Sequence, residues 1–241
     1  MLGMLGMLTE YMNIIGISFT MCWLSIGFTY FLLPYGYHDK QLKLLQYIPG
    51  LLHSIVVCPP TLYFYYTEEA AELQHNIYGF STLLQYIFSI SFGFFLYDIV
   101  LGIIMNKRIF IIHGTVCCIG TAIILYPFAQ YFCAPLILYE LSSISYNIRM
   151  IMIHTNNGYG NLFYFIEATF ALTFIFIRIF IGIPFTLINT PIVLDIIYNG
   201  DLHSKLYSII VFCVGYTLIG LNCYWARDIT NRILSKIRYI F

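Results

Sequence analysis

The chain has 241 residues, of which 60% are hydrophobic and only 9% are charged, and its mean hydropathy is +0.83. A soluble domain has roughly a quarter of its residues charged, so much of the surface of this protein must face something other than water. The formal net charge is zero, which argues against nucleic acid as a partner, because phosphate binding needs a basic excess. The length suits one compact bundle better than two domains.

The cysteines lie almost entirely inside apolar runs, at Cys22, Cys58, Cys117, Cys118, Cys133, Cys213 and Cys223. No CxxC pair and no Cys/His ligand spacing occurs, so we expect apolar packing rather than a disulfide, a metal site or a cofactor. The N-terminal run Met-Leu-Gly-Met-Leu-Gly-Met-Leu lacks the basic region that opens a signal peptide. We therefore expect any targeting signal to be internal.

About 20 apolar residues cross a hydrocarbon core of about 30 Å as a helix. Runs of this length predict about seven transmembrane helices, at roughly 13–34, 48–66, 79–105, 109–127, 129–151, 162–188 and 203–226. Turn residues stand at their ends, as in Pro49-Gly50 and Asn157-Gly158. The second run contains Pro59-Pro60, and neighbouring helices would have to satisfy the carbonyls freed there. The sequence therefore predicts an all-α membrane protein.

The basic residues test this span count independently. If the chain crosses seven times, one side of the membrane receives only Lys205, and the side of the C-terminus receives Lys40, Lys43, Lys107, Arg108, Arg149, Arg227, Arg232, Lys236 and Arg238. With one helix more or fewer, the basic residues would be distributed over both sides of the membrane. Because positive residues stay inside, the C-terminus is predicted to lie in the cytosol, or in the matrix if the protein is mitochondrial.

The chain divides into an N-terminal helix with its loop (1–47), a helical bundle (48–226) and a basic tail (227–241). As a helix, the tail would place basic residues among apolar ones and would suit a lipid surface. It could bind anionic lipid or a partner, or it could simply be a positive-inside tail.

Ionisable residues inside a span are costly and are therefore candidates for a functional site. The predicted spans contain six of them, with an asparagine as a neutral companion: His53, Asp98, His113, Glu140, Asn147, Glu167 and Arg178. The depth of each residue follows from a rise of 1.5 Å per residue. Asp98 lies roughly 10 Å from the C-terminal side of the membrane, and His53, His113 and Glu167 lie roughly 6–8 Å from it. Glu140 lies near the midplane.

Five of these groups, on five different helices, thus belong to the middle or to one half of the bilayer. If their faces converge, the bundle contains a polar cavity that opens toward the cytosolic or matrix side. The alternative is structural pairing, for example of Asp98 or Glu140 with Arg178 or a histidine, which would hold the helices in register.

Five short stretches occur in order along the chain. They are Leu51-Leu52-His53-Ser54; Gly93-Phe94-Phe95-Leu96-Tyr97-Asp98; Lys107-Arg108 followed by an apolar run and His113; Glu140-Leu141-Ser142-Ser143 followed by Asn147 and Arg149; and Phe174-Ile175-Phe176-Ile177-Arg178. In this order and spacing they resemble the TLC domain family, which includes the ceramide synthases. The resemblance covers about residues 48–188 and also the last span. It implies six core helices around a lipid-accessible cavity, one added N-terminal helix and a cytosolic C-terminus.

The departures from the family pattern bear on function. Ceramide synthases, which transfer an acyl group from acyl-CoA to a sphingoid amine, carry adjacent histidines in the fourth span and a His-Asp-x-x-x-Asp segment in the fifth. Here Gly114 follows His113, and Tyr139-Glu140 stands where the synthases have His-Asp. The resemblance is therefore nearer to the non-synthase branch, whose members are associated with lipid composition, sensing or trafficking.

Three functions remain open from the sequence. The first is a non-catalytic protein that binds or helps organise membrane lipid in the cavity. The second is an accessory subunit of a larger membrane complex, in the endoplasmic reticulum or the mitochondrial inner membrane. The third is a sphingoid-base N-acyltransferase that uses His113 with Asp98 or Glu140, although the incomplete histidine pair argues against an enzyme. Membrane lipids are the expected partners, and other membrane subunits are the alternative.

Overall fold

The structure is a computed structural model that describes the backbone of residues 2–32, 38–126 and 128–238, and the side chains of residues 9–25, 27, 44, 46–126 and 128–235. Within these ranges the chain is helical, with no strand. The elements are α1 (Leu2–Leu32), α2 (His38–Phe64), α3 (Glu68–Gln74), α4 (Thr82–Ile104), α5 (Arg108–Ile124), α6 (Gln130–Ile137), α7 (Glu140–His154), α8 (Asn161–Phe174), the π-helix η2 (Ile175–Ile181), α9 (Gly182–Asn199) and α10 (Leu202–Arg238).

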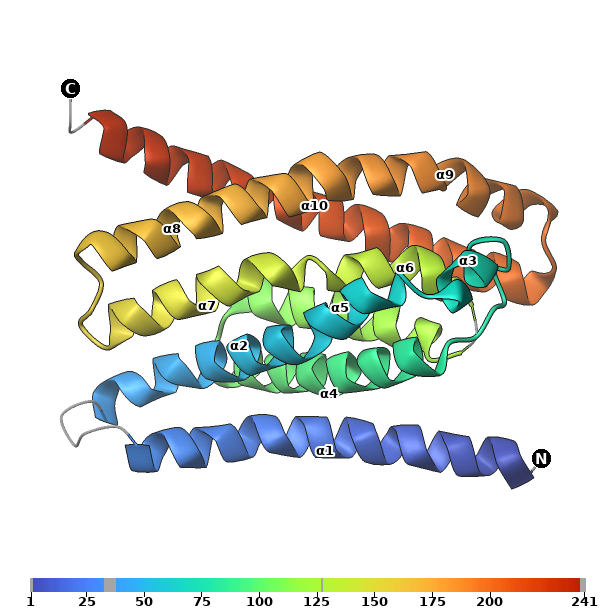
Figure 1. Ribbon diagram of the computed structural model, residues 1–241, viewed down its shortest axis with the longest axis horizontal. Helices are drawn as coiled ribbons and strands as arrows, with labels where there is room; N and C mark the ends of the chain where they lie inside the picture. The colour runs from blue at the N-terminus through green and yellow to red at the C-terminus, as the bar shows by residue number, and fades with distance from the viewer. Residues whose placement is uncertain (1, 33–37, 127, 239–241) are drawn as a thin grey trace.

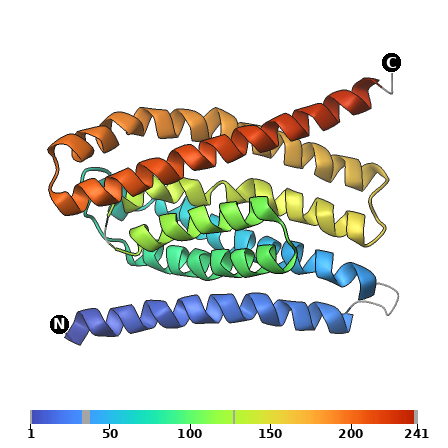
Figure 2. The ribbon, with the colours of Figure 1, turned by 180° about the vertical axis from the view of Figure 1, so that it is seen from behind.

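The helices run back and forth between two ends of an elongated bundle, and the chain termini lie at opposite ends (Figures 1 and 2). Four described segments are long and apolar enough to cross a membrane, namely 46–64 in α2, 82–104 in α4, the continuous run 161–199 and 202–235 in α10. Helix α5 is a shorter apolar helix, and α6 and α7 together make one further pass. With α1, these passes give the seven-helix layout that the sequence predicts, so the protein is an integral membrane protein.

Six of the passes close into a ring. Helix α2 packs on α4 and α7, α4 packs on α5, α5 packs on α10, α10 packs on η2 and α9, and α8 packs on α7. Helix α1 lies outside this ring against α4, on the side of the bundle opposite to α8 and α9 (Figure 1). Its close approach depends on Gly93, where a Cβ would lie 2.8 Å from Cβ of Ser18. The six-helix core with one added N-terminal helix is therefore confirmed.

The sixth and seventh passes are longer than predicted. The run from α8 to α9 continues for 39 residues instead of ending near residue 188, which corresponds to about 58 Å of helix. Helix α10 continues without a break from the seventh span into the predicted tail and ends at Arg238. Both helices therefore extend beyond a hydrocarbon core of about 30 Å unless they are steeply tilted. The division into 1–47, 48–226 and 227–241 stays a prediction.

The ends of the bundle differ in charge in the way the sequence suggests. Lys107 and Arg108 start α5, and Arg227 and Arg232 lie on the C-terminal part of α10, at the same end of the bundle. We call this the basic end, and we call the other end, which carries α3 and Asp201, the acidic end. The side chains of four predicted basic-end residues lie outside the described residues, namely Lys40, Lys43, Lys236 and Arg238. Which end faces the cytosol or matrix stays a prediction.

Candidate functional site

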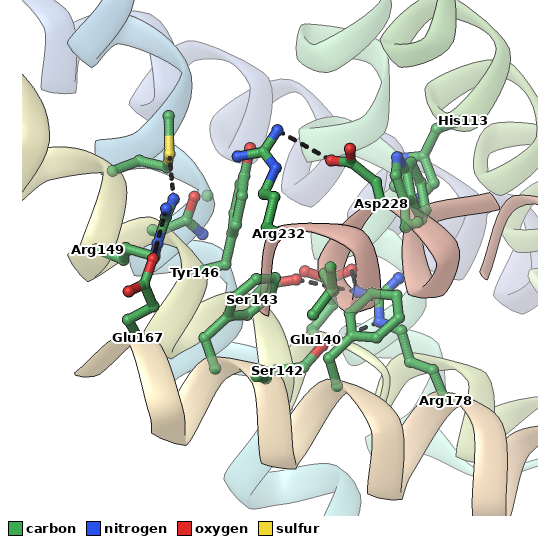
Figure 3. A pocket seen from close by; sticks show the side chains of 18 of the residues that line it. His113, Glu140, Ser142, Ser143, Tyr146, Arg149, Glu167, Arg178, Asp228 and Arg232 are labelled. Atoms are coloured by element: carbon green, nitrogen blue, oxygen red, sulfur yellow. Dashed lines mark hydrogen bonds and ion pairs between the residues drawn. The ribbon is translucent and has the colours of Figure 1, made fainter. Parts of the chain in front are cut away.

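A cavity of about 820 Å³ occupies the basic-end half of the bundle (Figure 3). All six passes of the ring contribute to its lining, through α2, α4, α5, α7, α8, η2 and α10. The lining includes six of the seven predicted site residues: Asp98, His113, Glu140, Asn147, Glu167 and Arg178. Residues that lie as far apart in the chain as 98 and 178 thus share one interior space.

The polar floor of the cavity forms at a break in the fifth pass. Pro135 lacks the N–H that would bond to Tyr131, and the hydroxyl of Tyr65 donates to the Tyr131 carbonyl instead, at 3.1 Å. Tight turns at Leu138 and Tyr139 then separate α6 from α7. Glu140 therefore becomes the first residue of α7, where the helix dipole favours a carboxylate. Broken helices are tolerated at membrane depth where they line a cavity, which is the case here.

A second irregularity faces the break. Arg178 lies in the π-helix η2 and is only 6% exposed. Its Nε donates to Ser142 Oγ at 2.9 Å, and its Nη2 donates to the Tyr139 carbonyl and to Ser143 Oγ, both at 3.1 Å. Nη1 donates to Oδ1 of Asn222, on α10, at 3.2 Å. The guanidinium thus ties the sixth pass to the fifth and the seventh.

Glu140 is the counter-charge of this arginine, but their contact is loose. Glu140 Oε1 lies 3.9 Å from Arg178 Nη2, beyond hydrogen-bonding distance. The other oxygen, Oε2, accepts a hydrogen bond from Ser54 of α2 at 3.3 Å. Aromatic rings surround the guanidinium, with centroids 5.2 Å away at Phe174, 5.7 Å at Tyr139 and 5.9 Å at Trp225. Figure 3 shows Glu140, Ser142 and Ser143 gathered near Arg178.

Asp98 and His113 form a second buried group, on α4 and α5. Asp98 is 6% exposed, and its Oδ2 lies 3.9 Å from Nδ1 of His113. The other ring nitrogen of His113, Nε2, lies 3.5 Å from Sγ of Cys117. Trp225 packs edge-on against the imidazole with 5.5 Å between centroids. The distance between the Asp98 carboxylate and the imidazole is therefore longer than that of a normal hydrogen bond.

Two further ion pairs lie toward the basic end of the cavity. Arg149 of α7 donates from Nε and Nη2 to Oε1 of Glu167 on α8, at 3.1 and 2.9 Å, and both side chains are mostly buried. Arg232 and Asp228 pair within α10 at 2.9 Å, and both are more than half exposed. In Figure 3, Arg149 and Glu167 lie across the cavity from Arg178. The Arg149–Glu167 pair joins α7 to α8 and forms part of the wall.

The remaining two predicted residues have packing contacts. Asn147 lines the cavity where α2 and α7 come close, since a Cβ at Gly50 would lie 2.9 Å from Asn147 Nδ2. His53 does not line the cavity. Its ring stacks on Phe94 at 4.1 Å between centroids, its Nε2 lies 3.1 Å from Ser91 Oγ, and Phe94 itself forms the wall. His53 thus lies behind the cavity.

Several residues of the site are not among the predicted ones. Cys117 follows His113 by four residues, a spacing that places two side chains on one helix face and could have identified it. Ser142 and Ser143 lie inside the Glu-Leu-Ser-Ser stretch and could have been read as partners of a buried charge. Nothing in the local sequence marks Asn222 or Trp225, which reach the cluster only through the packing of α10.

The arrangement combines a polar floor with an apolar wall. Apolar lining residues come chiefly from α8 and α10 and from the aromatic side chains around Arg178, among them Phe170, Ala171, Leu172, Phe174, Ile229 and Ile233. Among the described residues, no group of three or more His, Cys, Asp or Glu side chains could hold a metal ion. Such a surface is suited to an amphiphile, whose polar and apolar parts would each meet a matching region.

The comparisons with known proteins agree with this architecture. A sequence model of the TLC domain matches residues 43–231, which include α4 to α9, nearly all of α2 and most of α10. No curated protein gives a significant match to the chain. Because the matched region spans most of the chain and the ring of six passes lies within it, the protein belongs to the TLC domain family.

Proposed function

We propose that this protein binds a membrane lipid in the cavity of its basic-end half and does not chemically convert it. The observation that carries the proposal is the cavity itself. Its volume of about 820 Å³ is within the range of about 300–1,000 Å³ that is usual for small-molecule sites. Buried charged and hydroxyl groups line one part of it and exposed apolar side chains line another.

The surroundings of His113 support binding rather than the acyl transfer of ceramide synthases. A second histidine would have to replace Gly114, where a Cβ would already lie 3.0 Å from Ile99 Cγ1 and 3.2 Å from the Phe95 carbonyl oxygen. Both distances are shorter than an ordinary van der Waals contact, and the contact with Phe95 involves a backbone atom. A paired histidine would therefore require Ile99 and the backbone at Phe95 to shift, which supports the proposal that the protein is nearer to the non-synthase branch.

The proposal can be tested by counting bound lipid. Protein purified in a mild detergent should retain about one lipid per chain, detected by native mass spectrometry and by lipid extraction. Ala171→Trp should reduce this retention at least tenfold, because Ala171 lines the cavity and an indole there would fill it. Ile188→Trp is the matched control, since Ile188 is 73% exposed on α9 and lies outside the cavity lining.

Equal retention by the two variants, or no bound lipid in the wild type, would contradict the proposal. Co-purification of a partner protein at fixed stoichiometry, with an empty cavity, would instead favour the accessory-subunit function. An acyl-CoA transfer assay addresses the third function, the N-acyltransferase. We expect no transfer to a sphingoid amine above background, and a rate that His113→Ala abolishes would show that the protein is an enzyme.

A further inference from the structure

We propose that the bound lipid has a polar head that carries hydrogen-bond donors and no phosphate. This head lies deepest in the cavity, against Asp98 and Glu140, and the hydrocarbon tail leaves the bundle between α8 and α10. This inference rests on the proposed function and deepens it, because it names the chemical class of the occupant and its orientation. Three features of the cavity carry it: unused acceptors at the floor, the sign of the lining charge and the position of the mouth.

The floor presents acceptors that the protein does not fully use. The Asp98 carboxylate is more than nine-tenths buried, and its Oδ2 lies 3.9 Å from Nδ1 of His113. One oxygen of Glu140 is likewise 3.9 Å from its guanidinium partner. The other oxygen of Glu140 accepts a hydrogen bond from Ser54 at 3.3 Å. Because an ionised carboxylate can accept about four hydrogen bonds, both groups can accept more, and a ligand that donates hydrogen bonds to them would gain most. Hydroxyl, amide and ammonium groups are such donors.

The charge of the lining opposes a phosphate head. Four carboxylates line the cavity, at Asp98, Glu140, Glu167 and Asp228, against the three guanidinium groups of Arg149, Arg178 and Arg232. Even with His113 protonated, the lining would carry no positive excess. Two of the three arginines also donate to carboxylates at 2.9 Å, and Arg178 donates to four protein oxygens. A phosphate would therefore find repulsion and few free donors.

The exposed lining residues mark where the cavity opens. On α8, Tyr164 is 57% and Leu172 is 71% exposed, and on α10, Tyr224 is 60% exposed, although all three line the cavity. The cavity therefore opens along these two helices at the depth of apolar side chains, and its exposed lining continues to Arg232 and Ile233 toward the basic end. Deeper passage toward the acidic end is blocked, because side chains such as Phe64, Phe88 and Phe128 fill that half and are at most 1% exposed. The acidic end therefore offers no exit for a tail.

A native mass spectrometry titration of the whole protein in detergent tests the head group. The probes are a monoacylglycerol, which has two free hydroxyls, and a lysophosphatidate with the same acyl chain. We expect the monoacylglycerol to bind at least tenfold more tightly. Asp98→Asn, which replaces one acceptor oxygen by a donor, should weaken monoacylglycerol binding about tenfold and leave lysophosphatidate binding unchanged or stronger. If Asp98→Asn does not fold, the preference of the wild type still decides.

A second variant tests the exit of the tail. Leu172→Trp should narrow the mouth and weaken monoacylglycerol binding about tenfold, whereas Leu187→Trp, at a half-exposed position of α9 outside the cavity lining, should have no effect. Preference for the phosphate probe, or full binding by both Asp98→Asn and Leu172→Trp, would overturn the inference. These outcomes would leave the proposed function standing if lipid still co-purifies. Failure of every probe together with an absence of co-purified lipid would overturn both.

Discussion

The two halves of the bundle handle buried polar groups differently. In the acidic-end half, an apolar cluster packs α2 to α6 together, and a void between α6, α9 and α10 measures only about 20 Å³, about enough for one water. The basic-end half contains a cavity some forty times larger, of about 820 Å³. Both halves belong to the same six passes, so the difference is in the side chains.

Neutral amides and hydroxyls serve as polar ties in the acidic-end half. Gln130 accepts from the Ser81 N–H at 2.8 Å and donates to the Ile124 carbonyl at 3.1 Å, and Gln85 donates to the Leu125 carbonyl at 2.9 Å. These bonds between neutral groups hold loop ends and helix ends together, and Glu69, which accepts from the Ser81 hydroxyl at 2.9 Å, is only partly buried. A ring of this kind therefore does not need ion pairs to hold its register, which favours a ligand-related role for Asp98, Glu140 and Arg178.

The largest expected effect on stability is in the packed half. Phe88→Ala should lower the free energy of unfolding by about 4 kcal/mol, because Phe88 is 1% exposed and its removal leaves a void. Phe170→Ala, at the cavity wall, should cost less than about 1.5 kcal/mol, since part of its surface already borders empty space. Unfolding in mixed detergent measures both. Equal losses would show that the two halves are packed alike.

The next effect concerns the buried charges. Arg178→Met should cost about 3 kcal/mol, because it leaves Glu140 without its counter-charge in a site that is 7% exposed. The double variant Arg178→Met with Glu140→Gln should recover at least about 1 kcal/mol of this loss. A double variant as unstable as the single one would mean that the charges are independent and that lost hydrogen bonds explain the whole effect.

The Arg149–Glu167 pair in the cavity wall and the exposed Arg232–Asp228 pair on α10 should contribute differently to the free energy of unfolding. Glu167→Gln should cost about 1 kcal/mol, because Arg149 donates two short hydrogen bonds to its carboxylate in a mostly buried position. Asp228→Asn, which removes the exposed partner of Arg232, should change stability by less than about 0.5 kcal/mol. A larger effect for Asp228 than for Glu167 would place the rigid wall of the cavity on α10 instead of α7 and α8.

The smallest effect is a pH dependence at the acidic end. Asp201 precedes α10 and accepts hydrogen bonds from the N–H and hydroxyl of Ser204 at 2.7 and 2.6 Å, which lower the pKa of its carboxyl below the usual 3.8. A lowered pKa stabilises the fold above the unfolded-state pKa, and this stabilisation is lost as the pH falls through the folded-state value. The stability advantage of the wild type over Asp201→Asn should therefore be constant above about pH 5 and shrink below pH 4. Melting temperatures measured across this range test it, and an advantage that grows in acid would contradict it.

Length and hydropathy are sufficient to predict the number of passes and their approximate positions, because the bilayer fixes how many apolar residues each must contain at least. The cost of charges in lipid predicts either that Asp98, His113, Glu140 and Arg178 share a cavity or that they form structural pairs, and the sequence does not choose between the two. In contrast, the π-helix around Arg178 is not visible in its own stretch of sequence. Pro135 marks a weak point in the fifth pass, but the contacts that Arg178 makes with the residues after the break come from another pass. His53 shows the same limit: its depth suggested the cavity, but its direction was set by stacking on Phe94.

The 39-residue run from α8 to α9 shows a further limit. The sixth span is predicted to end near residue 188, yet Asn189 donates to the Phe185 carbonyl and Thr190 to the Thr186 carbonyl within the helix. Such local bonds satisfy polar side chains without ending the helix. Where this helix leaves the membrane is therefore decided by its tilt and its neighbours rather than by composition.

An electron cryo-microscopy map of the protein in a lipid bilayer disc tests the central claim, that the basic-end cavity holds a lipid, most directly. The account predicts elongated density that starts within hydrogen-bonding distance of Asp98 and Glu140 and leaves between Leu172 and Tyr224 toward the bilayer. A cavity that contains only water, or that closes because α8 packs directly on α10, would contradict it.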